Sequence, residues 1–245
     1  MCETCEERGK GWLGWNRAPL REPGAPRGPW IDLSHPVGPK MPCASIFPAP
    51  SLTMLKQQPQ DPFNVTELKM VVHAGTHVDS PRHYYLDGPA FEDVPLERLH
   101  GPGVVWHIPT EPNQVIGVAE LERARPELRG GDFLAIDTGW APKFGTETYE
   151  HHPSLSAEAA TWLSERGIRM LAVDFATPDL VYHLRQPGFN WPVHHILLSR
   201  GILVCEHLRG HAVFAGKRVE FMFNAINIAG SDGAPARVLG REVAA

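Results

Sequence analysis

The sequence has little cysteine and lacks the cysteine pattern of a disulfide-stabilised protein. Its 245 residues include four cysteines, and a chain of this length can bury about three quarters of its unfolded surface without covalent cross-links. Cys2 and Cys5 form a C-x-x-C pair in a polar tail without a second such pair, so we interpret them as an ungrouped pair. Cys205 follows three apolar residues, which predicts a small, buried, hydrophobic side chain.

The sequence also lacks an excess of positive charge and any long apolar run. The formal net charge is -5 at pH 7, and we therefore expect no nucleic-acid partner. No stretch approaches the roughly 18 apolar residues that span a bilayer, so we expect no membrane partner. Residues 1–7 are polar and acidic, without the apolar segment of a signal peptide, and a cytoplasmic location is the default expectation.

The order of strand and helix patterns predicts one mixed α/β domain. We expect residues 1–29 to form an N-terminal arm, partly flexible or packed against a neighbouring subunit, and residues 30–245 to form the domain. The segment 36–62 is rich in proline and is expected to be an irregular loop. Apolar runs predict strands, and 3.6-residue periodicity predicts helices that alternate with them. The strands are expected at 68–72, 103–108, 132–137, 170–174, 202–206 and 220–228, and the helices at 117–124, 156–167 and 194–200.

Three histidines and one aspartate lie within eleven residues, in the segment HAGTHVDSPRH from His73 to His83. Imidazole nitrogen and carboxylate oxygen are ligands of zinc and manganese in catalytic sites. A flat strand would separate His73 from His77 by roughly 13 Å, too far for one ion with bonds of about 2.1 Å. The chain must therefore bend, and Gly75 permits the bend. The segment predicts a metal site that activates water for hydrolysis.

A second segment, residues 194–206, can complete this site. A helix over 194–200 followed by Gly201 and a strand over 202–206 would return the chain to its starting level. His194, or its neighbour His195, would then lie close to Glu206. Glu206 follows four apolar residues, so its carboxylate is expected to be buried, where a metal ion or an arginine such as Arg209 would offset the cost.

These residues resemble the cyclase family of metal-dependent hydrolases, which includes bacterial kynurenine formamidase and isatin hydrolase. The family signature H-x-G-T-H-x-D-x-P-x-H matches residues 73–83 at every fixed position, and the resemblance extends over roughly residues 30–240. Further matching segments are IDLS at 31–34, GDFL at 131–134 with TGW at 138–140, VD at 173–174 with PD at 178–179, and GSDGAPAR at 230–237.

The resemblance implies a swivelling β/β/α-type fold, a homodimer or homotetramer, and one or two Zn²⁺ or Mn²⁺ ions. It implies that His73 and His77 bind the first metal and that His194 binds the second. Asp79 would bridge two metals or complete a single site, and Glu206 would bridge. His194 is preferred to His195 because its distance from the glutamate matches the family spacing. His83 would be the general acid and base.

The implied activity is hydrolysis of a small-molecule amide, either an aryl formamide such as N-formylkynurenine or a cyclic amide such as isatin or a lactam. The alternatives are a biosynthetic hydrolase or cyclase acting on another carbonyl, and a non-catalytic binding module. The P-x-W-P-G element of kynurenine formamidases is replaced here by the loop 41–50, in which Phe47 before Pro48 takes the place of the substrate-packing tryptophan. Phe63, Phe189 and Trp191 also suggest an aromatic or apolar pocket.

Overall fold

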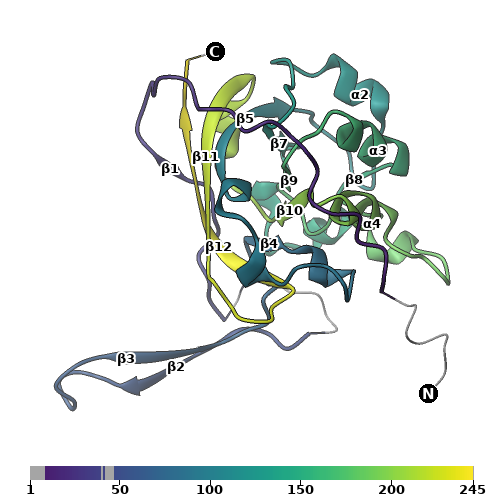
Figure 1. Ribbon diagram of the computed structural model, residues 1–245. Coiled ribbons are helices and arrows are strands. Elements are labelled where there is room, and N and C mark those ends of the chain that lie inside the picture. Colours follow the sequence, from purple (N-terminus) through teal and green to yellow (C-terminus); the bar gives the residue numbers. More distant parts are fainter. Residues whose placement is uncertain (1–8, 40, 42–46, 245) are drawn as a thin grey trace.

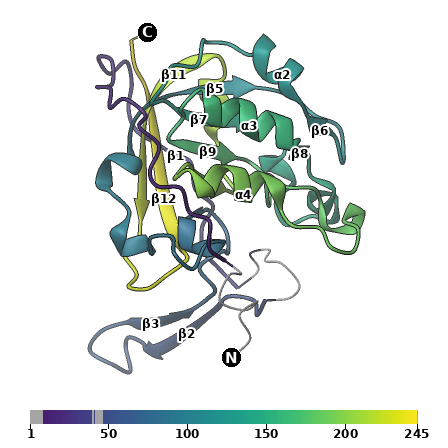
Figure 2. The ribbon, with the colours of Figure 1, turned by 45° about the vertical axis from the view of Figure 1, so that its right-hand side comes forward.

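A computed structural model describes residues 9–39, 41 and 47–244. A mixed eight-stranded sheet dominates it, with helices packed against one face (Figures 1 and 2). The strands of this sheet are β1 (Ile31–Asp32), β4 (His77–Asp79), β5 (His100–His107), β7 (Phe133–Asp137), β9 (Met170–Val173), β10 (Leu203–Glu206), β11 (Lys217–Ala225) and β12 (Gly233–Glu242). The helices are α2 (Val118–Arg123), α3 (Ala157–Glu165) and α4 (Pro192–Ser199). Short 3₁₀ turns lie between several of these elements.

The sheet closes on itself like a barrel. Its strand order is β1-β12-β11-β5-β7-β9-β10-β4, and β4 pairs a second time, with β12. Strands β5, β7, β9 and β10 run parallel, whereas the pairs that contain β4, β11 or β12 are antiparallel. The predicted α/β class with a mixed sheet is therefore confirmed.

Side chains that alternate along the strands form two separate cores. Phe133, Ala135 and Cys205 belong to the core enclosed by the sheet. Leu134, Ile136 and their neighbours face the other way, toward α3 and α4. This alternation is the two-residue period of a strand. Cys205 is fully buried, as predicted.

The helix boundaries follow from local chemistry. Ser156 begins α3 because its side chain accepts a hydrogen bond from the backbone N–H of Ala159. Helix α4 starts with Pro192, whose missing N–H is not needed in a first turn. It ends before Gly201, which has a φ of 65°, and a Cβ there would lie 2.5 Å from the Trp15 ring.

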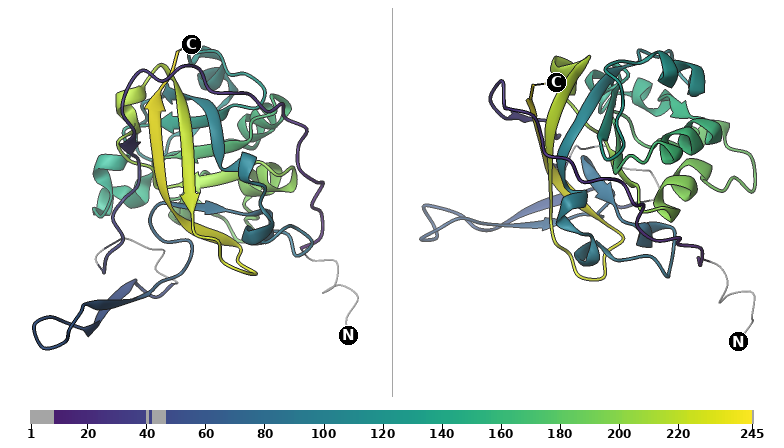
Figure 3. Two further views of the ribbon diagram at one scale, coloured as in Figure 1. Left: turned by 60° about the vertical axis from the view of Figure 1, so that its left-hand side comes forward. Right: turned by 45° about the horizontal axis from the view of Figure 1, so that its top comes forward.

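Two expectations about secondary structure were wrong, and one strand was missed. The proline-rich segment 36–62 was expected to be irregular, yet it contains β2 (Ser51–Lys56). The expected strand at 68–72 ends early, because β3 (Val65–Lys69) pairs with β2 as a hairpin and the chain then turns toward His73. Strand β12 was not foreseen. Figures 1 and 3 show the β2–β3 hairpin projecting from the body of the molecule. A small separate sheet contains β6 (Val115–Ile116) and β8 (Ser154–Leu155).

Residues 9–29 run along the surface of the same chain without forming a helix. The backbone N–H of Leu13 donates to the carbonyl of Ser199 over 2.7 Å, and Pro26 forms an isolated bridge with Val243. Cys2 and Cys5 lie outside the described residues. No helix in the described part of the chain is long and apolar enough to cross a membrane.

Candidate metal centre

Strand β4 presents two of the predicted ligands on one face of the sheet. Val78 points into the enclosed core, so His77 and Asp79 point to the opposite face, toward α4. Strand β10 pairs with β4 so that Glu206 lies opposite His77 and Val204 lies opposite Asp79. This register brings the imidazole of His77 close to the carboxylates of Asp79 and Glu206.

The turn before β4 brings His73 back to the same point. Gly75 has a φ of 64°, and a Cβ at this position would lie 2.3 Å from the sulfur of Met41, so the predicted bend is confirmed. Thr76 fixes the turn, because its hydroxyl donates to the carbonyl of His207 over 2.7 Å. His73 Nδ1 then lies 2.8 Å from Asp79 Oδ1.

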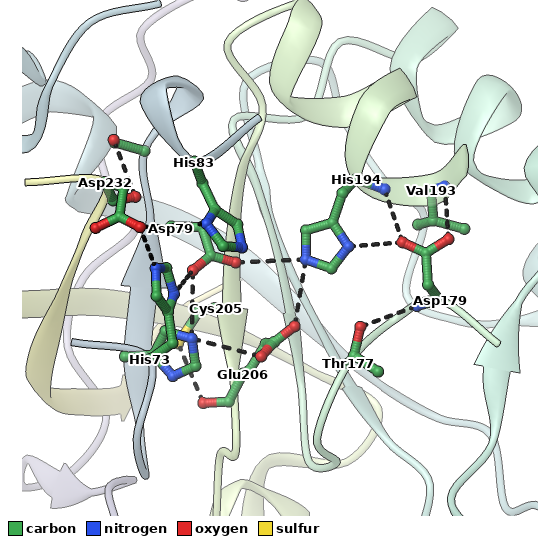
Figure 4. Close-up of polar contacts among 12 residues, drawn as sticks. His73, Asp79, His83, Thr177, Asp179, Val193, His194, Cys205, Glu206 and Asp232 are labelled. Atoms are coloured by element: carbon green, nitrogen blue, oxygen red, sulfur yellow. Dashed lines mark hydrogen bonds and ion pairs between the residues drawn. The ribbon is translucent and has the colours of Figure 1, made fainter. Parts of the chain in front are cut away.

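Helix α4 supplies the histidine from the second segment. Asp179 accepts the backbone N–H groups of Val193 and His194 over 2.9 and 3.1 Å, and it also contacts His194 Nδ1 at 2.6 Å. The other ring nitrogen of His194 points to the centre (Figure 4). His195 points elsewhere, with its Nδ1 2.9 Å from the Tyr85 hydroxyl. Of the two candidates, the structure thus places His194 at the centre.

The carboxylates of Asp79 and Glu206 lie between the imidazoles of His77 and His194, and each imidazole approaches a different oxygen of each carboxylate. His77 Nε2 lies 3.2 Å from Asp79 Oδ1 and 3.4 Å from Glu206 Oε2. His194 Nε2 lies 3.4 Å from Asp79 Oδ2 and 3.3 Å from Glu206 Oε1. Arg209 does not neutralise Glu206, because its guanidinium donates to the carbonyl of Ser34.

This donor set fits a divalent metal ion. Ligands at the corners of a tetrahedron with bonds of about 2.1 Å are about 3.4 Å apart, which matches the separations above. His77 Nε2 and Asp79 Oδ2 are buried and have no hydrogen-bond partner, and a cation would satisfy both. His77 Nδ1 lies 2.8 Å from the carbonyl of Gly75, which leaves the lone pair of Nε2 for a metal.

Protons and a cation compete for this centre. Burial lowers the pKa of His73, but its hydrogen bonds with Asp232 and Asp79 raise it, with a net result of about 10. Burial raises the pKa of Asp79, but His77, His194 and His73 hold it well below its usual value. Metal binding would therefore displace the proton of His73.

His83 lies at the exposed edge of the site, beside the candidate metal ligands. Its ring stacks on that of His73 with the centroids 4.0 Å apart, and its Nδ1 lies 3.4 Å from Asp232 Oδ2. The His83 side chain is 27% exposed, compared with 1% for His77. Its position suits an exchange of protons with a substrate.

Sequence reasoning assigned no role to Asp179 or Asp232, although both lie in segments that carried the resemblance. Asp232 Oδ2 is 2.8 Å from His73 Nε2, and Asp179 orients His194. His207 was also missed: it is buried, its φ is 57°, and its Nδ1 contacts the Tyr149 hydroxyl at 2.7 Å. The signal available in the sequence was a histidine directly after Glu206, at the end of an apolar run.

Phe47 is 41% exposed, and residues 42–46 before it lie outside the described residues, so its role stays a prediction.

Relatives of this chain align with most of its length, and solved structures share its fold. A kynurenine formamidase of Bacillus cereus is 29% identical over 215 residues, which cover 87% of this chain and 98% of the relative. A solved structure titled "Potential Metal-Dependent Hydrolase With Cyclase Activity" has a TM-score of 0.73 and 25% identity, covering 89% of this chain and 99% of the other. Isatin hydrolase A from Labrenzia aggregata has a TM-score of 0.78 and 20% identity, covering 88% and 94%, and this likeness concerns the fold.

The family relationship expected from the sequence is confirmed. The family model "Cyclase: Putative cyclase" matches residues 31–180. This span holds the turn at Gly75, the strand β4 and His83. The chain therefore belongs to the cyclase family.

Proposed function

We propose that this protein is a metal-dependent hydrolase that cleaves the C–N amide bond of an aryl formamide, such as N-formylkynurenine, or of a cyclic amide. The observation that carries the proposal is the pair of buried carboxylates, Asp79 and Glu206, that lies between His77 and His194, with His83 at the exposed edge of the site. Relatives named kynurenine formamidase support the amide substrate.

Nitrogen and oxygen ligands of this kind suit Zn²⁺ or Mn²⁺, and we propose that one or two such ions bind. His77, Asp79, His194 and Glu206 would hold the ion, and His73 would join them once it has lost its proton. A bound ion would lower the pKa of water and polarise the substrate carbonyl.

The chain's own residues supply the proton transfers. Water attacks the amide carbon, and His83 accepts the proton that the water loses. The C–N bond then breaks, and His83 returns that proton to the leaving nitrogen. Asp232, 3.4 Å from His83 Nδ1, would stabilise the protonated imidazole and fix its orientation. Tyr84 stacks on His194 and would shield one side of the reaction from water.

Hydrolysis by the metal-loaded protein tests the proposal. Protein reconstituted separately with zinc and with manganese is assayed on N-formylkynurenine, formanilide, isatin and a simple lactam. Turnover of a formamide that a chelator abolishes and added metal restores is the expected result. Turnover of isatin alone would assign a cyclic-amide hydrolase. No turnover of any compound by metal-loaded protein would contradict the proposal and favour another carbonyl substrate or a binding module.

We also propose that the protein is a homodimer or homotetramer in which the β2–β3 hairpin packs against a second copy. Two-stranded hairpins are marginally stable alone in water, and every residue of both strands is exposed. Six large apolar side chains of the hairpin and its turn are more than a third exposed: Leu52, Met54, Leu55, Phe63, Val65 and Leu68. Exposed apolar side chains gathered on one hairpin are typical of an interface.

Light scattering after size exclusion tests the assembly. Leu52 and Leu68 lie opposite each other in the hairpin, and changing both to Asn should release monomers. Leu96→Asn is the control, because Leu96 is 80% exposed and lies outside the hairpin. A monomeric wild-type protein at micromolar concentration would refute the assembly.

A further inference from the structure

The loop between β9 and α4 gathers aromatic rings around one arginine. The guanidinium carbon of Arg185 lies 5.8 Å from the ring centroid of Tyr182, 5.1 Å from that of Phe189 and 5.4 Å from that of Trp191. Each distance is within the range of a cation–π contact. The three rings thus hold the guanidinium in place without neutralising it.

Arg185 has no carboxylate partner in the described part of the chain. Its Nε donates to the carbonyl of Leu180 over 2.7 Å, and no described carboxylate oxygen lies within ion-pair distance of its guanidinium. Burial lowers the pKa of Arg185, and the charges of Asp179 and Glu206 act in the opposite direction. Arginine keeps its positive charge at every physiological pH. The side chain is therefore a half-buried, unpaired cation.

An unbroken row of rings connects this cation to the metal centre. The Tyr84 ring stacks on His194 with the centroids 5.0 Å apart and an angle of 25° between the rings. Trp191 lies 6.4 Å from Tyr84 and 5.6 Å from Phe189. A flat aromatic molecule could lie along these rings with one end at the centre and the other near Arg185.

The backbone of Trp191 supports a functional role for this surface. Its φ of 49° and ψ of 61° are left-handed, a conformation that costs energy for a bulky residue and that persists chiefly at functional sites. Trp191 directly precedes α4 and is 37% exposed. The left-handed backbone thus holds a large, partly exposed ring beside Arg185.

We propose that Arg185 is a specificity-determining residue that binds an anionic group, such as a carboxylate, on an aromatic substrate whose ring packs against Tyr84 and Trp191. The inference rests on the proposed amide hydrolysis, since it names the chemical class of that substrate. A guanidinium can bind a carboxylate through two parallel hydrogen bonds. Partial burial strengthens such a contact, because water competes less for both charges.

A matched set of substrates, with and without a carboxylate, tests the inference. Formanilide and the 2-, 3- and 4-formamidobenzoates share the ring and the scissile bond and differ by one carboxylate. The wild type should prefer the best-placed formamidobenzoate. In Arg185→Gln, kcat/KM for that compound should fall about 10- to 100-fold relative to formanilide, chiefly through KM, because a hydrogen bond to a charged group is lost. Arg185→Lys should restore part of the preference.

Arg166→Gln is the control variant. The Arg166 guanidinium also lies over a tryptophan ring, 3.2 Å from the centroid of Trp162, but it belongs to the loop after α3. This change should leave the preference unaltered. An equal fall for both substrates in Arg185→Gln, or equal use of both by the wild type, would overturn the inference.

A binding measurement separates this inference from the proposed function. Isothermal titration with benzoate is carried out on the wild type and Arg185→Gln, with and without zinc. Binding weakened at least tenfold by the substitution, in both metal states, would support the anion site even if none of the amides were hydrolysed. Binding that requires zinc and ignores Arg185 would overturn it, since the carboxylate would then bind the metal alone.

Discussion

Asp179→Asn should weaken metal binding although Asp179 is not expected to touch the ion. The wild-type carboxylate accepts three bonds: from the N–H of Val193, from the N–H of His194 and from His194 Nδ1. An asparagine has only one acceptor oxygen. If that oxygen faces His194, the new NH₂ group opposes the N–H of Val193, and one buried backbone donor loses its partner at a cost of about 1–3 kcal/mol in stability.

The opposite orientation has a different consequence. The NH₂ group would then donate to His194 Nδ1 and force the ring proton onto Nε2, the nitrogen that faces Asp79 and Glu206. A protonated Nε2 cannot bind a metal. Loss of a partner that orients a ligand typically lowers metal affinity about 10- to 100-fold, which corresponds to about 1.4–2.7 kcal/mol. We expect a fall of this size in the second orientation, whereas the first orientation keeps the proton on Nδ1 and lowers the stability instead.

Competition for zinc with a chromophoric chelator measures this affinity, and urea unfolding measures the stability. Glu220→Gln is the control, because Glu220 is buried and its Oε1 lies 2.8 Å from His100 Nε2, in a histidine–carboxylate pair away from the centre. It should lower stability without changing metal affinity. If Asp179→Asn bound zinc as tightly as the wild type and was also as stable in urea, the role of Asp179 in orienting His194 as a ligand would be refuted.

Three further changes have definite expected outcomes. His83→Ala should lower kcat by about 10²- to 10⁴-fold with metal content unchanged; parallel metal loss on elemental analysis would instead make His83 a ligand. Gly75→Ala should cost several kcal/mol in urea unfolding, because a Cβ would lie 2.3 Å from the Met41 sulfur at a φ of 64°; wild-type stability would show that the turn adapts. Burial lowers the pKa of His152 to about 4. The buried, neutral imidazole therefore contributes about 3 kcal/mol to the free energy of unfolding above pH 6.5, and this contribution is lost as the pH falls from 6.5 toward 4. Unfolding of His152→Asn from pH 7 to 4 should show a correspondingly weaker pH dependence, and a slope equal to that of the wild type would place the acid sensitivity elsewhere.

The local parts of the site could be predicted because they depend on neighbouring residues. The bend at Gly75 followed from the distance that a flat strand would impose, and it is present. The return of the chain from His194 to Glu206 followed from the rise of a helix and of a strand, and the two side chains meet. The bend and the return of the chain both depend only on a short stretch of sequence and on standard backbone geometry.

The parts that depend on distant pairing could not be predicted in the same way. Asp179 and Asp232 approach the histidines only because separate segments meet in the closed sheet, and although both lie in segments that match the family, chain geometry alone gave neither of them a role. The hairpin was missed because prolines in segment 36–62 suggested an irregular loop, although residues 51–54 of β2 (SLTM) alternate between polar and apolar as a strand does.

Strand β4 is only three residues long, yet it pairs with both β10 and β12 and so completes the ring of strands. The same three residues include His77 and Asp79. A molecule in which this strand is absent from its place, or slipped by one residue, would turn both ligands away from Glu206. The metal content of a purified preparation should therefore measure the fraction of molecules whose sheet has closed in the correct register, before any substrate is known.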